Sequence, residues 1–194
     1  MEDIYRVRIT FVEPLLGTAP KDRELYARYV ASKAPDPSGE AETVEEVEEK
    51  GWTGFHQEGG KPFIYDYVIK GFFKDACGML RRAPGTLSER LKAYKKVIDG
   101  LVFVRPRRIF LDLNGQEMGV LERPLRASTP QGERVALARS DAAPPGTRIE
   151  FDVVVLGVVT EDLLREWLDY GRRRGLGQWR NGGYGAFEYE LERL

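Results

Sequence analysis

The first residues of the chain alternate between apolar and polar side chains. Tyr5, Val7, Ile9 and Phe11 are apolar, and a polar residue stands between each pair. Successive side chains of a strand point to opposite faces, so this period of two predicts a strand with one buried face. The same alternation near the end of the chain predicts a final strand over residues 187–191.

The segment after Pro62 changes to the period of a helix, predicted over residues 63–80. Its apolar residues have the three- and four-residue spacing of a stripe that packs on a sheet, and they are Ile69, Phe72, Phe73, Ala76 and Leu80. On the other side, Lys70, Lys74 and Arg81 lie within about 40° of one another around the helix. They form one exposed basic stripe.

Turn and capping signals predict the remaining elements. A short basic helix is expected over residues 88–99, and Thr160 is suited to cap a last helix that ends near Arg174. Asn114–Gly115 is a typical hairpin turn and predicts a local ribbon between its flanking strands. Strands are expected over residues 101–104, 107–113, 118–121 and 149–156. Residues 123–146 contain four prolines and little periodicity, with brief pairing expected at 135–137.

This order of elements predicts the fold class. Without its insertions it is βαββαβ, the pattern of an α+β, ferredoxin-like (RRM-like) fold. A chain of 194 residues is long enough to bury a core as one domain. We therefore expect a single domain, residues 1–194, with insertions at about 14–60 and 105–145. Within the first insertion, residues 22–33 suggest a polar helix and the acidic run 40–50 a solvated segment.

Charge is segregated along the chain, although the net charge is only −1. Residues 40–50 are acidic, whereas residues 70–96, the cluster 105–108 and residues 172–180 are basic. A positive field over the whole protein is absent, so binding to nucleic acid has to come from a local patch.

Cysteine and hydropathy exclude several classes of protein. Cys77 is the only cysteine and lies in an apolar helical pattern, so it predicts a buried thiol without a disulfide or thiolate metal site. We expect no metal and no cofactor, because neither clustered ligand spacing nor a P-loop is present. The chain contains no long apolar run, and we expect a cytoplasmic protein without a membrane partner.

A glycine-rich loop precedes the final strand. Its glycines permit positive φ and close approach of the backbone to a ligand, and amides in such a loop bind phosphates. Cations and stacking rings accompany them, and the candidate contacts are Arg172, Arg173, Arg174, Gly177, Trp179, Arg180, Gly182, Gly183 and Tyr184. Two alternatives remain open. The glycines are also typical of a flexible connection between helix and strand, and the arginines are also favoured at the C-terminus of a helix by its dipole.

Two segments resemble the RAMP superfamily of CRISPR systems. Residues 62–74 (Pro-Phe-Ile, then Val-Ile-Lys-Gly-Phe-Phe-Lys) resemble its "P-x-I-P then S-x-K-G" motif, and residues 175–187 resemble its glycine-rich loop. The sequence departs from the motif at Asp66-Tyr67. The resemblance implies binding of single-stranded nucleic acid, RNA rather than DNA, through the loop and through Lys70, Lys74 and Arg81. It also implies a homo-oligomer or effector-complex partners, or a phage relative that binds single-stranded DNA.

Support for catalysis is weaker. His56 is the only histidine, which excludes a two-histidine ribonuclease site within one chain but leaves a lone general base open. Asp22 is a second candidate, since some effector subunits cut RNA with a loop aspartate. We expect a binding protein without catalytic residues; a metal-independent endoribonuclease and an interaction protein without nucleic acid are the alternatives.

The open face of the predicted sheet does not suit base stacking. Arg6 and Arg8 would lie there beside acidic residues of the neighbouring strands, namely Glu150, Asp152, Glu188 and Glu190. These charges are expected to pair across strands. The nucleic acid is therefore expected on helix and loop edges.

Overall fold

A four-stranded antiparallel sheet forms the centre of the protein. The structure is a computed structural model that describes the backbone of residues 2–21, 52–129 and 132–194, and the side chains among them outside 125–136. The sheet has the order β12 (Phe187–Arg193), β1 (Glu2–Phe11), β11 (Arg148–Leu156) and β7 (Val102–Arg105). This is the strand order of a ferredoxin-like fold, so the predicted fold class is confirmed.

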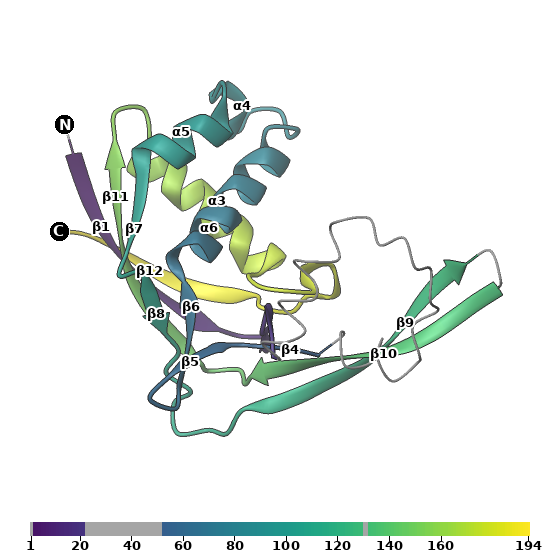
Figure 1. Ribbon diagram of the computed structural model, residues 1–194. Coiled ribbons are helices and arrows are strands. Elements are labelled where there is room, and N and C mark those ends of the chain that lie inside the picture. The colour runs from purple at the N-terminus through teal and green to yellow at the C-terminus, as the bar shows by residue number, and fades with distance from the viewer. Residues whose placement is uncertain (1, 22–51, 130–131) are drawn as a thin grey trace, which may run out of the picture.

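The alternation in β1 determines which face of this sheet is buried. Val7 is opposite Phe151 and Ile9 is opposite Ile149, and all four side chains lie in the core. Two helices cover this face (Figure 1): α3 (Asp66–Leu80) and α6 (Glu161–Arg174). Phe73 is fully buried and packs on Trp167 of α6, with ring centroids 5.4 Å apart.

The first long helix is confirmed, but it begins at Asp66 rather than at Phe63. Ile69, Phe72, Phe73 and Ala76 are buried as predicted, and so is Cys77. However, residues before Asp66 form a strand, β6 (Lys61–Tyr65), because they pair with β8 (Arg108–Phe110) and β5 (His56–Glu58) in a separate three-stranded sheet. The basic helix predicted over residues 88–99 is two helices, α4 (Leu87–Arg90) and α5 (Tyr94–Leu101), since Ala93 between them has a φ of 49°.

The hairpin predicted at Asn114–Gly115 is wrong. Both residues have positive φ, but the chain before them pairs with β6 and, through Asp112, with Arg148. The chain after them forms β9 (Gly119–Thr129), which pairs along its length with β10 (Gly132–Ala143). The segment with little periodicity is thus a long hairpin that extends away from the helices (Figure 1), because backbone pairing needs no apolar alternation.

Short strands connect this hairpin to the core. β10 pairs with β2 (Leu15–Leu16) and with β4 (Trp52–Gly54), and β4 pairs with β3 (Ala19–Pro20). The polar helix and the acidic run predicted within residues 22–50, together with Asp22, lie outside the described residues. The predicted cap of α6 is confirmed, since Thr160 Oγ1 accepts a hydrogen bond from the Leu163 amide.

Candidate nucleic-acid interface

The glycine-rich loop leaves the end of α6 and returns as β12. Gly175 and Gly185 close its base, where the Leu176 amide donates to the Gly185 carbonyl at 2.9 Å. Gly185 has a φ of 72°, and a Cβ there would lie only 1.9 Å from the Leu176 carbonyl oxygen. At these two positions the glycines are required by the close approach of the two ends of the loop.

The far side of the loop forms an open cavity. Trp179 has a φ of 54° and precedes the short 3₁₀ helix η1 (Arg180–Gly182). The cavity has a volume of about 570 Å³, and its lining residues are Arg174, Gly177, Gln178, Trp179, Arg180, Asn181 and Gly182. Trp179 and Tyr184 lie near each other, with ring centroids 6.1 Å apart and a tilt of 48°. The structure therefore brings Gly177, Gly182, Trp179, Arg174 and Arg180 together.

The predicted arginines separate into three environments. Arg174 and Arg180 both reach Asp75 of α3, at 3.4 and 2.8 Å, so one carboxylate holds two guanidinium groups at the cavity. Arg172 pairs instead with Glu188 of β12 at 2.8 Å, and this hydrogen bond raises its pKa. Arg173 is exposed and contacts no acidic group in the described part of the chain. It is the arginine with a charge available to a ligand.

The loop amides contribute less than the sequence suggested. Gly182 donates to the Trp179 carbonyl and Gly183 to the Arg180 carbonyl, so both amides are used within the turn. The Gly177 amide donates to no described residue. Of the three glycines, only Gly177 therefore has an amide available for an anion.

Arg123, on β9, is a site residue that sequence reasoning missed. Its guanidinium lies over the Trp179 ring, and its Nη2 donates to Gln178 Oε1 at 3.3 Å. The side chain is only 8% exposed, and its Nε and Nη1 have no hydrogen-bond partner among the described residues. Burial lowers its pKa to about 10. No local sequence pattern identifies Arg123 as part of this site, because only the tertiary packing of the β9–β10 hairpin places it beside the loop.

The basic stripe of α3 lies apart from the loop and is not freely exposed. Lys74 pairs with Asp99 of α5, which lowers the pKa of that carboxyl, and Lys70 donates to the Asp99 carbonyl at 3.0 Å. Arg81 lies over the ring of Tyr94. The prediction that Lys70 and Lys74 are exposed is wrong, because the C-terminal end of α5 packs beside them and both are partly buried.

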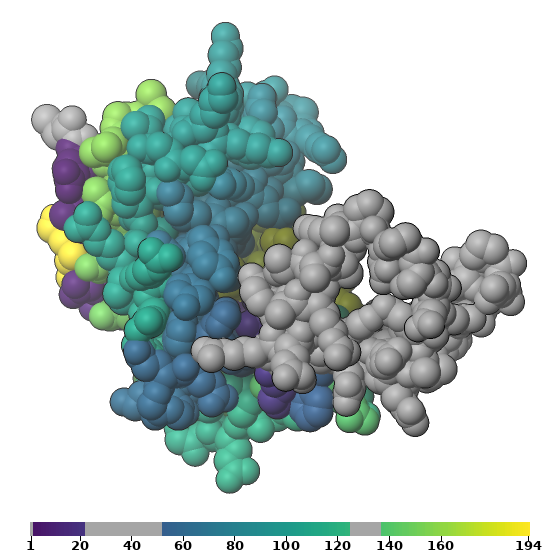
Figure 2. Space-filling view, viewed as in Figure 1, coloured from purple at the N-terminus to yellow at the C-terminus, as the bar shows by residue number. Residues whose placement is uncertain are grey.

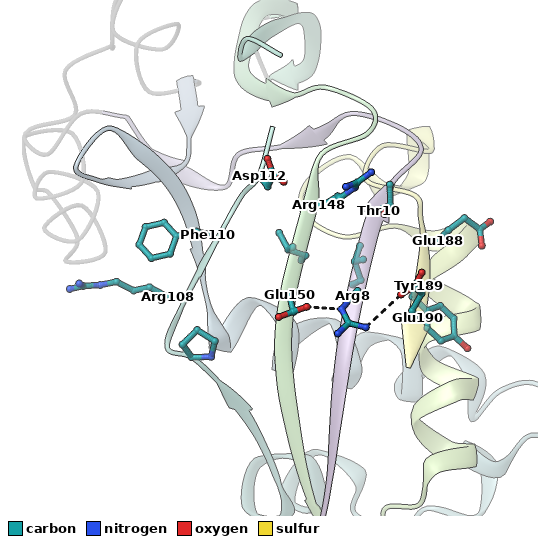
Figure 3. A pocket seen from close by; sticks show the side chains of 13 residues that line it. Arg8, Thr10, Arg108, Phe110, Asp112, Arg148, Glu150, Glu188, Tyr189 and Glu190 are labelled. Atoms are coloured by element: carbon teal, nitrogen blue, oxygen red, sulfur yellow. Dashed lines mark hydrogen bonds and ion pairs between the residues drawn. The ribbon is translucent and has the colours of Figure 1, made fainter. Parts of the chain in front are cut away.

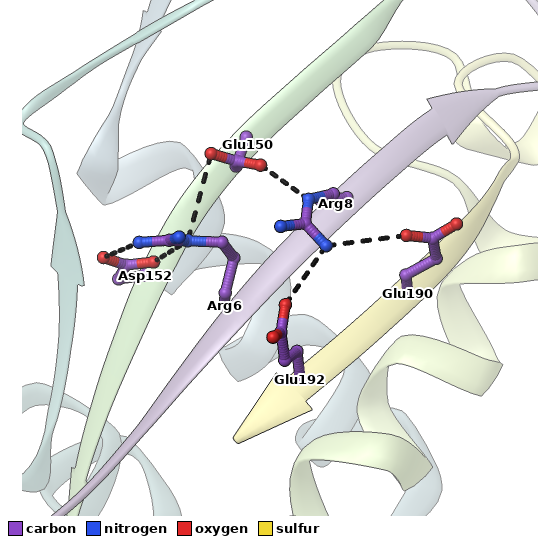
Figure 4. A network of polar contacts seen from close by, with 6 residues as sticks. All are labelled: Arg6, Arg8, Glu150, Asp152, Glu190 and Glu192. Carbon is purple, nitrogen blue, oxygen red and sulfur yellow. Dashed lines mark hydrogen bonds and ion pairs between the residues drawn. The ribbon is translucent and has the colours of Figure 1, made fainter. Parts of the chain in front are cut away.

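The outer face of the main sheet carries paired charges, as predicted (Figure 4). Arg6 pairs with Asp152 at 2.9 Å, and Arg8 pairs with Glu150 at 2.7 Å and with Glu192 at 3.2 Å. A cavity of about 840 Å³ lies over this face, between the paired charges and β8 (Figure 3). Because its carboxylates and guanidinium groups neutralise one another, this face offers little attraction to a polyanion.

His56 lies in the small sheet, far along the chain from the loop. It stacks on Phe63 and contacts Tyr65, and partial desolvation of its mostly exposed ring lowers its pKa. Within residues 2–21, 52–129 and 132–194, no three His, Cys, Asp or Glu side chains are grouped as metal ligands. None of the described helices combines the length and the apolar character needed to cross a membrane.

The fold and the loop define a class: an α+β protein with a ferredoxin-like core and a cation-lined, aromatic loop at the edge of its sheet. The sequence matches no protein-family model and no curated protein. Its fold is similar to that of one chain in a structure described as the cryo-EM structure of the Type III-B Cmr-beta bound to cognate target RNA.

That similarity is distant. The two chains are 14% identical with a TM-score of 0.55, and the match covers 100% of this chain and 61% of the other. This chain thus spans about three-fifths of the length of its structural neighbour. At this identity the likeness establishes the fold.

Proposed function

We propose that the protein binds single-stranded nucleic acid, RNA in preference to DNA, through the glycine-rich loop, as a RAMP-type subunit. The observation that carries the proposal is the cavity at the loop, where Trp179 presents an indole and Arg174 and Arg180 line the wall. Stacking of a base on an aromatic ring contributes about 1–3 kcal/mol and tolerates any base. Arginine supplies the contacts to phosphate that dominate affinity for single strands.

The local charge supports this assignment. Four arginines belong to the loop or lie beside it, namely Arg123, Arg173, Arg174 and Arg180, and Asp75 is the carboxylate that Arg174 and Arg180 share. An excess of guanidinium groups at one loop provides the patch that a net charge of −1 does not. The structural neighbour belongs to a structure with bound target RNA, which favours RNA over DNA and a place among other subunits of a complex.

We propose a binding role without catalysis. His56 lies in the small sheet, away from the loop, and Arg108 and Glu58 beside it already pair with each other. A metal-independent endoribonuclease is the alternative, because a lone histidine with a lowered pKa is a competent general base.

The test removes two cations of the loop and its flank by substitutions that are expected to leave the fold unchanged. Arg173→Gln combined with Arg180→Gln is expected to weaken binding of a labelled single-stranded RNA. It is also expected to make the dependence of log K on log salt shallower by about 0.7 for each phosphate contact removed. Glutamine is preferred to glutamate because a carboxylate at position 180 would face Asp75. Fluorescence anisotropy at several salt concentrations measures both quantities.

A matched control loses the same charge elsewhere. Arg165→Gln combined with Arg193→Gln removes cations that pair with Glu161 and Asp3, away from the loop. If the loop variant is folded and keeps both the affinity and the salt slope of the parent, the assigned contact is wrong. If the parent binds neither RNA nor DNA at low salt, the interaction-protein alternative replaces the proposal. Competition between RNA and DNA of the same sequence tests the preference.

A further inference from the structure

The small sheet β5–β6–β8 carries a row of aromatic rings on one face. The register places His56 opposite Phe63 and Phe63 opposite Phe110, so these three rings lie side by side across the strands. Tyr65 belongs to the same face, two residues further along β6. We call His56, Phe63, Tyr65 and Phe110 the ring row.

The rings of the ring row contact one another. The centroid of Phe63 lies 5.6 Å from those of His56 and Phe110 and 5.1 Å from that of Tyr65. Tyr65 also stacks on Tyr67 at the start of α3, with 5.3 Å between centroids. The opposite face of the sheet is buried through Ile64 and Ile109. The rings lie on the other face, where Phe63 at the centre of the row is itself buried, with 4% exposure, and the rings around it are less covered.

Part of the ring row is open to solvent. Phe110 is 41% exposed and His56 is exposed, and β5 and β6 lie at the surface below the helices (Figure 2). Phe110 and Arg108, on β8, line the cavity that also borders Arg8 and Glu150 of the main sheet (Figure 3). Phe110 therefore lies both at the edge of the ring row and at the border of the charged outer face.

A hollow of about 550 Å³ borders these rings, and its charges are balanced. His56, Phe63 and Tyr65 form one part of its wall. The two cations at the hollow, Lys21 and Arg108, pair with Asp141 and Glu58. The hollow therefore offers stacking faces and polar edges without excess charge, which suits a nucleobase better than a phosphate.

Cations for the phosphates lie next to the ring row. Arg105 and Arg107 are exposed and form no ion pair with the described residues. The Asp66 amide donates to the Arg107 carbonyl at 3.0 Å, which fixes Arg107 beside Tyr65 and Tyr67. This basic cluster is not part of the glycine-rich loop. Arg105 lies opposite Asp152 in the sheet register and Arg107 adjoins Asp66, but neither arginine forms an ion pair within the described part of the chain.

We propose that the ring row is a second binding surface for single-stranded nucleic acid, on which bases stack while Arg105 and Arg107 contact the flanking phosphates. Exposed rings on a sheet next to arginines have the chemistry by which single strands bind without sequence preference. The proposal shares the ligand class of the proposed function but uses a different surface. The proposal for the ring row and the proposal for the glycine-rich loop can therefore be tested independently of each other.

The test removes rings while keeping apolar volume. Tyr65→Leu combined with Phe110→Leu is expected to lower affinity for a labelled single-stranded RNA by at least about fivefold, the effect of one lost stack. Phe103→Leu is the matched control, because Phe103 is 40% exposed on β7, outside the ring row. A second variant, Arg105→Gln with Arg107→Gln, is compared with Arg82→Gln with Arg90→Gln, which removes two exposed cations elsewhere.

Each variant is made in the parent and in the Arg173→Gln, Arg180→Gln background, with unfolding measured in parallel. Loss of affinity in both backgrounds, with photo-cross-links from thiouridine-labelled RNA to residues 61–67 or 105–110, supports the second surface whatever the loop contributes. Unchanged affinity in the arginine variant, with cross-links confined to residues 175–186, overturns it. Loss of self-association in the ring variant with unchanged affinity for RNA also overturns it, and identifies the ring row as a contact with protein.

Discussion

Burial at the loop deprives Arg123 of part of its solvation. Its Nε and Nη1 have no hydrogen-bond partner in the described part of the chain, so they lack the hydrogen bonds that water would provide. The pKa of about 10 expresses the same penalty, since burial disfavours the charged form. The contact with Trp179 recovers part of this cost and fixes the indole at the cavity.

We expect Arg123→Met to reduce binding without unfolding the protein. Loss of the contact with Trp179 destabilises the folded protein, whereas removal of buried N–H groups that lack partners stabilises it. Because the two effects oppose each other, the free energy of unfolding should change by less than about 1 kcal/mol. Affinity for single-stranded RNA should fall, because the guanidinium group that holds the Trp179 ring in place is removed. Urea titration and anisotropy measure the two effects. A variant that binds as tightly as the parent would show that Arg123 has no part in the site.

At the scale of elements, α3 connects the core to the loop. Its apolar face packs on α6 and the sheet, one polar side presents Lys70 and Lys74 to α5, and Asp75 holds Arg174 and Arg180. The position of the loop cations therefore depends on the packing of this helix.

Phe73→Ala is expected to destabilise the protein by about 3–5 kcal/mol, the usual cost of truncating a buried phenylalanine. Phe73 is fully buried between Phe72 and Trp167. Chemical denaturation measures the loss. A value below about 1 kcal/mol would contradict the packing of α3.

The closure of the glycine-rich loop leads to a second prediction at this scale. Gly185 and Gly183 both have positive φ, but a Cβ at Gly185 would overlap the Leu176 carbonyl, whereas one at Gly183 meets nothing. Gly183→Ala should cost about 1–2 kcal/mol, the strain of the left-handed conformation alone. Gly185→Ala should cost clearly more and abolish binding. Equal unfolding free energies for the two variants would show that the loop base opens easily.

At the scale of the whole molecule, the two proposed binding surfaces lie outside the outer face of the main sheet. The outer face of the main sheet consists of ion pairs between half-exposed residues, which contribute little stability and leave little net charge. Rings gather at the loop and on the small sheet, with the exposed Arg173 next to the loop and the exposed Arg105 and Arg107 next to the small sheet.

The single histidine of the chain allows a clear test of catalysis. His56→Ala is expected to leave any processing of labelled RNA by highly purified protein unchanged, because we propose that the protein binds RNA without cutting it. Gel analysis of the products over time measures this. Cleavage that disappears with His56 while binding persists would make the endoribonuclease the leading function.

Local patterns predicted the elements whose faces differ in polarity. The alternation in β1, the apolar stripe of α3 and the cap of α6 each describe neighbours in sequence, and the structure agrees with all three. The glycine-rich loop was recognisable for the same reason, because glycines, arginines and rings stand within a few residues of one another.

The sequence by itself determined which faces of the main strands and helices are apolar, and from these the order βαββαβ. Tertiary structure decided which distant partners meet: Arg123 with Trp179, Asp75 with Arg180, and Asp99 with Lys74. It also turned a proline-containing segment into the β9–β10 hairpin and assembled the ring row from β5, β6 and β8. The physical reason is that periodicity reports local geometry, whereas pairing between distant segments is set by packing and backbone hydrogen bonds across the whole fold.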